Sequence, residues 1–240
     1  MVPAVAAARL QQSLGLSWPP VAISFRAEAP PGVAPIATSL AAGCGYWKQA
    51  AEGQTFYTTP DDHYGCPVGA HTHGVPLPAE RAGEFQSIVG TMLSLEYLRE
   101  EELPAIPRRN EPFGVAVYAP LHAAPVDPDL VLVRGTPRQV MLLSEAARAA
   151  GVFDDGATMG RPACAMLPHA ENTGRGVTSL GCIGNRVYTG LGDNELYLTL
   201  PGRALAAVVE KLDTLVTANR ALEGFHQGRL AERATTAPPS

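Results

Sequence analysis

A single α/β (or α+β) domain made of two related halves is the fold class that this sequence predicts. Short apolar segments, rich in β-branched and aromatic residues, alternate with segments of helical periodicity, and their order repeats once along the chain. Hydrophobic residues make up 46% of the 240 residues, which is enough for a sizeable core, and charged residues only 17%, which argues against disorder.

The first half covers about residues 15–105. Ser39 is a typical helix N-cap and Gly53 is typical of the residue just past a helix end, so a helix is expected between them. A loop rich in Gly and Pro follows, with three histidines, which is typical of an ordered functional loop. The expected elements are strands at 21–25 and 55–59, helices at 39–52 and 79–102, and the loop at 60–78.

The second half covers about residues 110–222. Thr136 followed by Pro137 predicts an N-cap with proline at the first helical position, and Gly151 closes that helix. The domain is expected to span 1–230, with a flexible tail at 231–240. The expected elements are strands at 114–119, 130–133, 176–180 and 195–200, and helices at 137–150, 162–170 and from 202 onward.

The two halves share an order of elements around their cysteines. Cys44 and Cys66 are 22 residues apart, Cys164 and Cys182 are 18 apart, and each second cysteine lies in a Gly-Cys turn after a predicted strand. We interpret this as an internal duplication with a pseudo-twofold arrangement and a site between the halves. The alternative is coincidence, since little residue identity connects the halves.

Composition excludes several classes of protein. A net charge of −5 provides no basic surface for nucleic acid. No apolar run approaches the roughly 20 residues of a membrane span, and no positively charged start precedes an apolar segment as in a signal peptide. We therefore expect a cytoplasmic protein whose partners are a small-molecule ligand or an electron-transfer protein, with homo-oligomerisation left open.

Several segments resemble the archaeal and bacterial family DUF169. They are residues 20–25 (PVAISF), 65–69 (GCPVG), 161–165 (RPACA) and 179–191 (SLGCIGNRVYTGL), and Glu195 fits an acidic position of that family. The resemblance extends over roughly residues 15–220. It implies a common fold and an importance of these glycines and cysteines, and it implies no reaction.

The four cysteines are the candidate cofactor ligands. Four are too few for a disulfide scaffold, and the chain is large enough not to need one. Thiolates are soft ligands, so Cys44, Cys66, Cys164 and Cys182 together suit an iron–sulfur cluster or zinc. No C-x₂-C pair occurs, which disfavours structural zinc. The alternative is that no metal is bound and the cysteines are buried apolar residues.

Two further functions remain open beside a redox or small-molecule-transforming metal protein. Cys66 with His71 or His73 could form a cofactor-free nucleophilic site, because a neighbouring histidine lowers the pKa of a thiol. The second alternative function is a non-catalytic module that binds a small ligand. Arg175 and Arg186 lie next to glycines and are candidates for binding an anionic substrate, with Glu195 as an alternative partner of Arg186.

Tyr46 and Trp47 follow Cys44 directly. These two aromatic residues either shield a centre from water or belong to the core.

Overall fold

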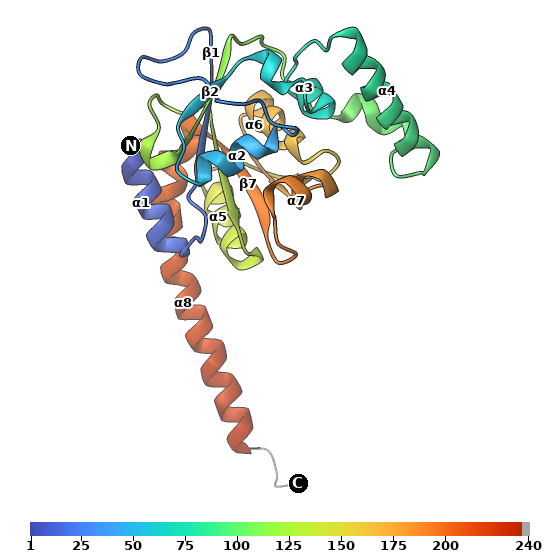
Figure 1. The fold of residues 1–240 in the computed structure, drawn as a ribbon. Coiled ribbons are helices and arrows are strands. Elements are labelled where there is room, and N and C mark those ends of the chain that lie inside the picture. The colour runs from blue at the N-terminus through green and yellow to red at the C-terminus, as the bar shows by residue number, and fades with distance from the viewer. Residues whose placement is uncertain (237–240) are drawn as a thin grey trace.

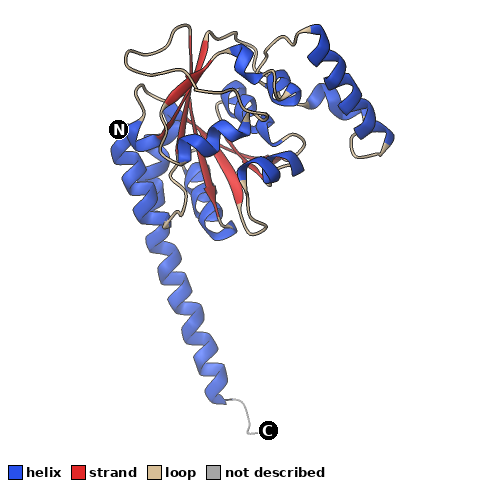
Figure 2. Ribbon diagram, in the orientation of Figure 1, coloured by secondary structure: helices blue, strands red, loops and turns tan. Residues whose placement is uncertain are grey.

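A computed structural model of the chain describes residues 1–236 and confirms the mixed α/β class (Figure 2). Its centre is a sheet of seven strands in the order β2-β3-β1-β4-β7-β6-β5. Neighbouring strands are antiparallel except for the parallel pair β5 and β6. The strands are β1 (Val21–Arg26), β2 (Phe56–Thr58), β3 (Val115–Pro120), β4 (Leu130–Gly135), β5 (Phe153–Met159), β6 (Gly176–Ser179) and β7 (Leu196–Pro201).

Helices cover both faces of this sheet (Figure 1). They are α1 (Pro3–Leu14), α2 (Cys44–Ala51), α3 (Pro67–Thr72), α4 (Ala79–Ser94), α5 (Pro137–Ala149), α6 (Met166–Thr173), α7 (Ile183–Thr189) and α8 (Leu205–Thr236). Short 3₁₀ turns lie at η1 (Pro60–His63), η2 (Glu100–Ala105), η3 (Leu121–Ala123), η4 (Ala163–Ala165) and η5 (Gly202–Ala204). The expected loop at 60–78 is therefore partly helical, and α1, β5 and α7 were not expected from the sequence. The helix expected at 39–52 begins at Cys44, and its N-cap is Gly43, not Ser39.

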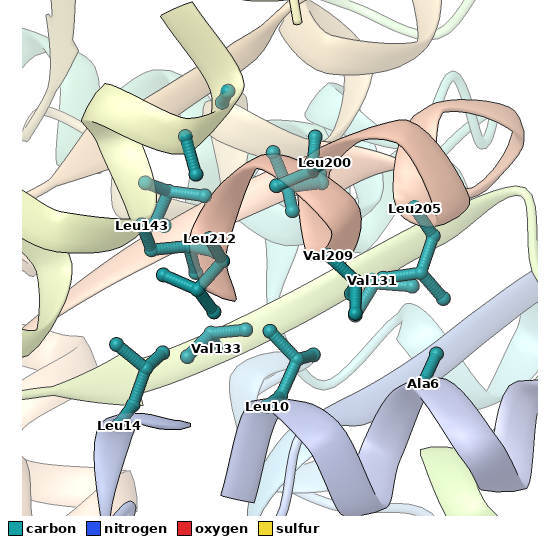
Figure 3. Close-up of a cluster of buried hydrophobic side chains, with 14 of the residues drawn as sticks. Ala6, Leu10, Leu14, Val131, Val133, Leu143, Leu200, Leu205, Val209 and Leu212 are labelled. Carbon is teal, nitrogen blue, oxygen red and sulfur yellow. The ribbon is translucent and has the colours of Figure 1, made fainter. Parts of the chain in front are cut away.

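One face of the sheet is packed by α1, α5 and α8 (Figure 3). Leu10, Leu143 and Leu212 come from these three helices and are fully buried. They belong to the same buried cluster as Val131 and Val133 of β4. The leucines beside these valines in the strand point to the opposite face of the sheet, since side chains alternate along a strand. The buried cluster on the α1, α5 and α8 face is mainly aliphatic, and the Arg9–Asp213 ion pair joins α1 and α8 at its edge.

The opposite face carries α2 and α6 over an aromatic core. Tyr46, Tyr118 and Tyr197 are almost completely buried there, and the Trp47 ring packs edge-on against Tyr197 with centroids 5.7 Å apart. Tyr46 and Trp47 thus belong to the core, the second of the two interpretations. Cys44 lies in the same cluster.

The strands β1 and β4 are antiparallel neighbours near the middle of the sheet. On one side follow β3 and β2, and on the other β7, β6 and β5. By the expected bounds of the halves, β3 belongs to the second half although it lies between two strands of the first half. The pseudo-twofold relation between the halves stays a prediction.

Two helices project from the body (Figure 1). The last helix, α8, packs against α1 and α5 and then continues into solvent, with residues 220–233 exposed. It includes residues 231–236 of the expected tail, and 237–240 lie outside the described residues. The other is α4, beside α3. No helix in the described part of the chain is long and apolar enough to span a membrane.

Candidate functional site

Each cysteine stands at the start of a helical segment. Cys44 is the first residue of α2, and Cys66 and Cys182 are the N-caps of α3 and α7. Cys164 lies in the 3₁₀ turn η4, which leads directly into α6. Backbone N–H groups without partners point outward at such positions, so this setting favours negative charge on the sulfur atoms.

All four cysteines line one cavity of about 590 Å³. Two come from the first half and two from the second, as the parallel spacing predicts. Cys44 is 9% exposed, and the other three are partly buried. Their free thiols share this cavity on the α2 and α6 side of the sheet.

Burial and mutual proximity control the protonation of two of the thiols. Burial first, and then the neighbouring Cys66 and Cys182, raise the pKa of Cys44 to about 12. Burial, and then the neighbouring Cys66, raise the pKa of Cys164 well above its ordinary value. Burial therefore favours the neutral thiol forms of both groups at pH 7, and a bound cation would favour their thiolate forms and release protons.

The backbone supplies hydrogen bonds to two of the sulfur atoms. The Gly69 N–H donates to Cys66 Sγ at 3.4 Å, and the Asn185 N–H donates to Cys182 Sγ at 3.5 Å. A Cβ atom at Gly69 would lie only 3.0 Å from Cys66 Sγ, so a larger residue there would require the sulfur atom to shift by a few tenths of an ångström. N–H groups directed at sulfur stabilise thiolates and sulfide-containing centres.

Asn185 was missed by the sequence reasoning, although it lies in the family-like segment. It is 2% exposed and lines the cavity. Neither atom of its side-chain amide has a hydrogen-bond partner of good geometry among residues 1–236. The amide lies near enough to Cys44 to lower the pKa of that thiol in part, against the larger effect of burial.

The structure separates the two histidines proposed beside Cys66. His71 lines the cavity and stacks on Phe85, with ring centroids 5.0 Å apart. His73 is buried outside it, hydrogen-bonded through Nδ1 to the Gly69 carbonyl at 2.8 Å, with the His63 ring centroid 5.0 Å away. Burial lowers the pKa of His73 to about 4, so it is neutral at pH 7. Only His71 shares the cavity with Cys66.

Arg186 and Arg175 are occupied by backbone groups. Arg186 donates hydrogen bonds to the carbonyl oxygens of Leu180 at 2.8 Å and Gly192 at 3.0 Å. Arg175 donates to the carbonyl oxygens of residues 151 and 153. Neither arginine is among the residues that line the cavity. Both therefore hold loops in place, and Glu195 pairs with Arg134 rather than Arg186.

The outer wall of the cavity comes from α4 and η2. Phe85, Ile88, Val89 and Met92 of α4 line it. They recur at a helical spacing that is typical of a face packed against a core, yet no residue of this fully described helix is buried. The apolar face of α4 thus borders the cavity instead of a packed core.

As the side chains stand, no three His, Cys, Asp or Glu residues within the described 1–236 are grouped closely enough to bind one metal ion. A tetrahedral zinc site with bonds of about 2.3 Å brings its sulfur atoms almost into contact. The cysteines share a cavity without forming such a compact set.

Comparisons with known proteins agree with the family-like segments. The chain matches the family DUF169, described as "Uncharacterised ArCR", over residues 9–211. It is 28% identical over 168 residues to an uncharacterised protein of Methanocaldococcus jannaschii, an alignment that covers 68% of this chain and 71% of that protein. No solved structure matches the chain significantly.

Proposed function

This chain belongs to the DUF169 family, and we propose that it is an iron–sulfur protein in which Cys44, Cys66, Cys164 and Cys182 bind one cluster. The cluster would serve a redox reaction or the transformation of a small molecule. The observation that carries the proposal is that all four cysteines of the chain, from four separate helical segments, line the same cavity.

The chemistry of the surroundings supports thiolate ligation. Two sulfur atoms already accept backbone N–H groups, and the other cysteines begin helical segments whose N–H groups favour negative charge. The aromatic core beneath the cavity limits access of water from the sheet side. A cytoplasmic setting, where thiols stay reduced, suits such a centre.

A cluster fits the arrangement better than a single ion. A mononuclear zinc site needs its four sulfur atoms in one compact tetrahedron, which the described side chains do not form. A cluster with several irons holds its thiolate ligands farther apart, with one on each iron in the four-iron form. Zinc therefore ranks second among the metals.

Anaerobic purification tests the proposal. We expect a brown protein that contains iron and acid-labile sulfide and absorbs near 400 nm, either as isolated or after addition of ferrous iron and sulfide. Cys182→Ser should retain much less iron than the wild type. Ile183→Ala is the matched control, because Ile183 is the next residue, is 74% exposed and bears no ligand atom.

Other results would favour the alternatives. A colourless protein that binds no iron under these conditions overturns the proposal. If iodoacetamide then labels the wild type rapidly at one thiol and Cys66→Ala loses that label, Cys66 is a reactive thiol, as a nucleophile requires, with His71 as its neighbour in the cavity. If no thiol is labelled rapidly, a non-catalytic ligand-binding protein remains.

A further inference from the structure

The cavity extends beyond the cysteines to α4, and this outer part has the properties of a ligand site. Its volume of about 590 Å³ is in the range of small-molecule pockets, roughly 300–1,000 Å³. Apolar side chains of α4 and η2, including Phe85, Val89 and Leu103, form much of its wall. A cluster bound to the cysteines would occupy only the inner end.

Apart from the stacking of His71 on Phe85, little of the described structure packs against the apolar face of α4. This helix has 16 residues and none is buried, although Ile88 and Met92 recur at helical spacing toward the cavity. In proteins most of the stability of a helix comes from tertiary packing of its apolar face. A molecule in the cavity would remove this apolar surface from water and hold α4 against the body of the protein.

The charged residues in the cavity wall already have partners. Arg161 pairs with Glu102 at 3.1 Å and donates to the Tyr97 carbonyl. Glu84 pairs with Arg81 at 2.6 Å on the same helix. A charged ligand would therefore find no free opposite charge among the described lining residues.

One polar group in the wall is unsatisfied. The Asn185 amide is buried, lines the cavity near the cysteines and has no hydrogen-bond partner of good geometry among the described residues. A buried amide without a partner is unfavourable unless a ligand or water satisfies it. It marks the place of one hydrogen-bonding group on a ligand.

From these observations we propose that the cavity binds an uncharged, mainly apolar organic molecule, with one hydroxyl or carbonyl group against Asn185 and its apolar part against α4. The binding itself does not depend on the metal. The statement that this molecule lies beside the cluster rests on the proposed function. This proposal differs from the sequence-based expectation of an anionic substrate, which rested on Arg175 and Arg186.

The test uses Nile red, an uncharged fluorophore, with the full-length protein purified anaerobically. We expect saturable binding that toluene and benzyl alcohol displace, benzyl alcohol more strongly, and benzoate at least about tenfold more weakly than benzyl alcohol. In Asn185→Leu, benzyl alcohol should lose its advantage over toluene. Equal competition by benzoate and benzyl alcohol would overturn the proposal.

Variants of α4 locate the site. Val89→Trp and Met92→Trp fill the cavity and should each weaken Nile red binding at least about tenfold. Gln86→Trp adds the same ring on an exposed position of α4 and should bind as the wild type does. Since no residue of α4 is buried, these changes should leave the fold intact, which circular dichroism checks. Unchanged binding in both cavity variants would overturn the proposal.

The iron and sulfide content of the same samples separates the two proposals. A brown protein that does not bind Nile red overturns the ligand site and leaves the cluster. A colourless protein that binds Nile red as expected overturns the cluster and leaves the ligand site.

Discussion

The buried ion pair between Arg134 on β4 and Glu195 provides a test of how α7 is held in place. Arg134 is 7% exposed and Glu195 16%. The Arg134 guanidinium also donates to the carbonyl oxygens of Thr189 at 3.3 Å and Gly190 at 2.7 Å, which end α7. Because Cys182 is the N-cap of the same helix, the Arg134–Glu195 ion pair connects one cysteine-bearing segment to the sheet.

Arg134→Met removes one partner and leaves the Glu195 carboxylate mostly buried. Breaking a buried pair in this way costs about 3–5 kcal/mol of unfolding free energy. For a chain of this size, that loss lowers Tm by roughly 6–20 °C. The double variant Arg134→Met/Glu195→Gln removes the uncompensated charge as well, so it should regain part of the lost stability.

Thermal unfolding followed by circular dichroism measures these values. The control is Arg138→Met, because Arg138 and its partner Glu223 are 61% and 46% exposed and such a pair contributes at most about 1 kcal/mol. The reasoning fails if Arg134→Met lowers Tm no more than Arg138→Met does. It also fails if the double variant is no more stable than Arg134→Met alone.

The same pair should respond to acid. Burial would raise the pKa of Glu195, but hydrogen bonds from Arg134 and the Gly192 N–H outweigh that effect and lower the pKa below its ordinary value. The contribution to stability is therefore complete above the unfolded pKa, about 4.3, and is lost as the pH falls through the lowered folded value.

Three further predictions concern the fold. Leu143→Ala leaves a cavity at a fully buried position of the core and should lower the free energy of unfolding, measured in urea, by about 2–5 kcal/mol. Met141→Ala, at a 42% exposed position, should lower it much less. Equal losses in the two variants would contradict the core assignment. Gly202→Ala would place its Cβ 1.7 Å from a backbone carbonyl oxygen and should lower Tm sharply. In Gly184→Ala the Cβ meets nothing within 4 Å, so Tm should stay nearly unchanged. An unchanged Tm in Gly202→Ala would refute the close approach of the two backbone segments at Gly202. The buried His73 has a pKa of about 4, against about 6.5 in the unfolded chain, so between these values it takes up its proton on unfolding. The free energy of unfolding should therefore fall by about 2 kcal/mol between pH 7 and pH 5, and His73→Gln should remove that part of the pH dependence. An unchanged dependence of stability on pH in His73→Gln would refute this prediction.

Local signals were sufficient for most elements. Thr136 and Pro137 predicted the start of α5, and the structure shows the full capping box, with Gln139 returning its side chain to the Thr136 N–H. The short apolar run LVLV at 130–133 predicted β4, and its side chains divide between the two cores. Such signals act within a few residues, so they can be read without knowledge of the rest of the chain.

Elements with weak local signals were missed. The strand β5 contains two aspartates and a glycine and lies at the edge of the sheet, where pairing with β6 holds it. The segment 60–78 is rich in Gly and Pro, yet it forms η1 and α3, with Cys66 as an N-cap in place of Ser or Asp. Here tertiary contacts outweighed the local preferences.

The sequence by itself determined the fold class, most of the element order and the four cysteines that line one cavity, because spacing and turn residues are properties of the chain. Only the tertiary structure decided which charged groups meet. Glu195 pairs with Arg134 because the register of β4 and β7 sets Arg134 opposite Tyr197, 63 positions away in the chain. The same holds for the apolar face of α4, since periodicity shows that a face is apolar, whereas packing decides whether it covers a core or a cavity.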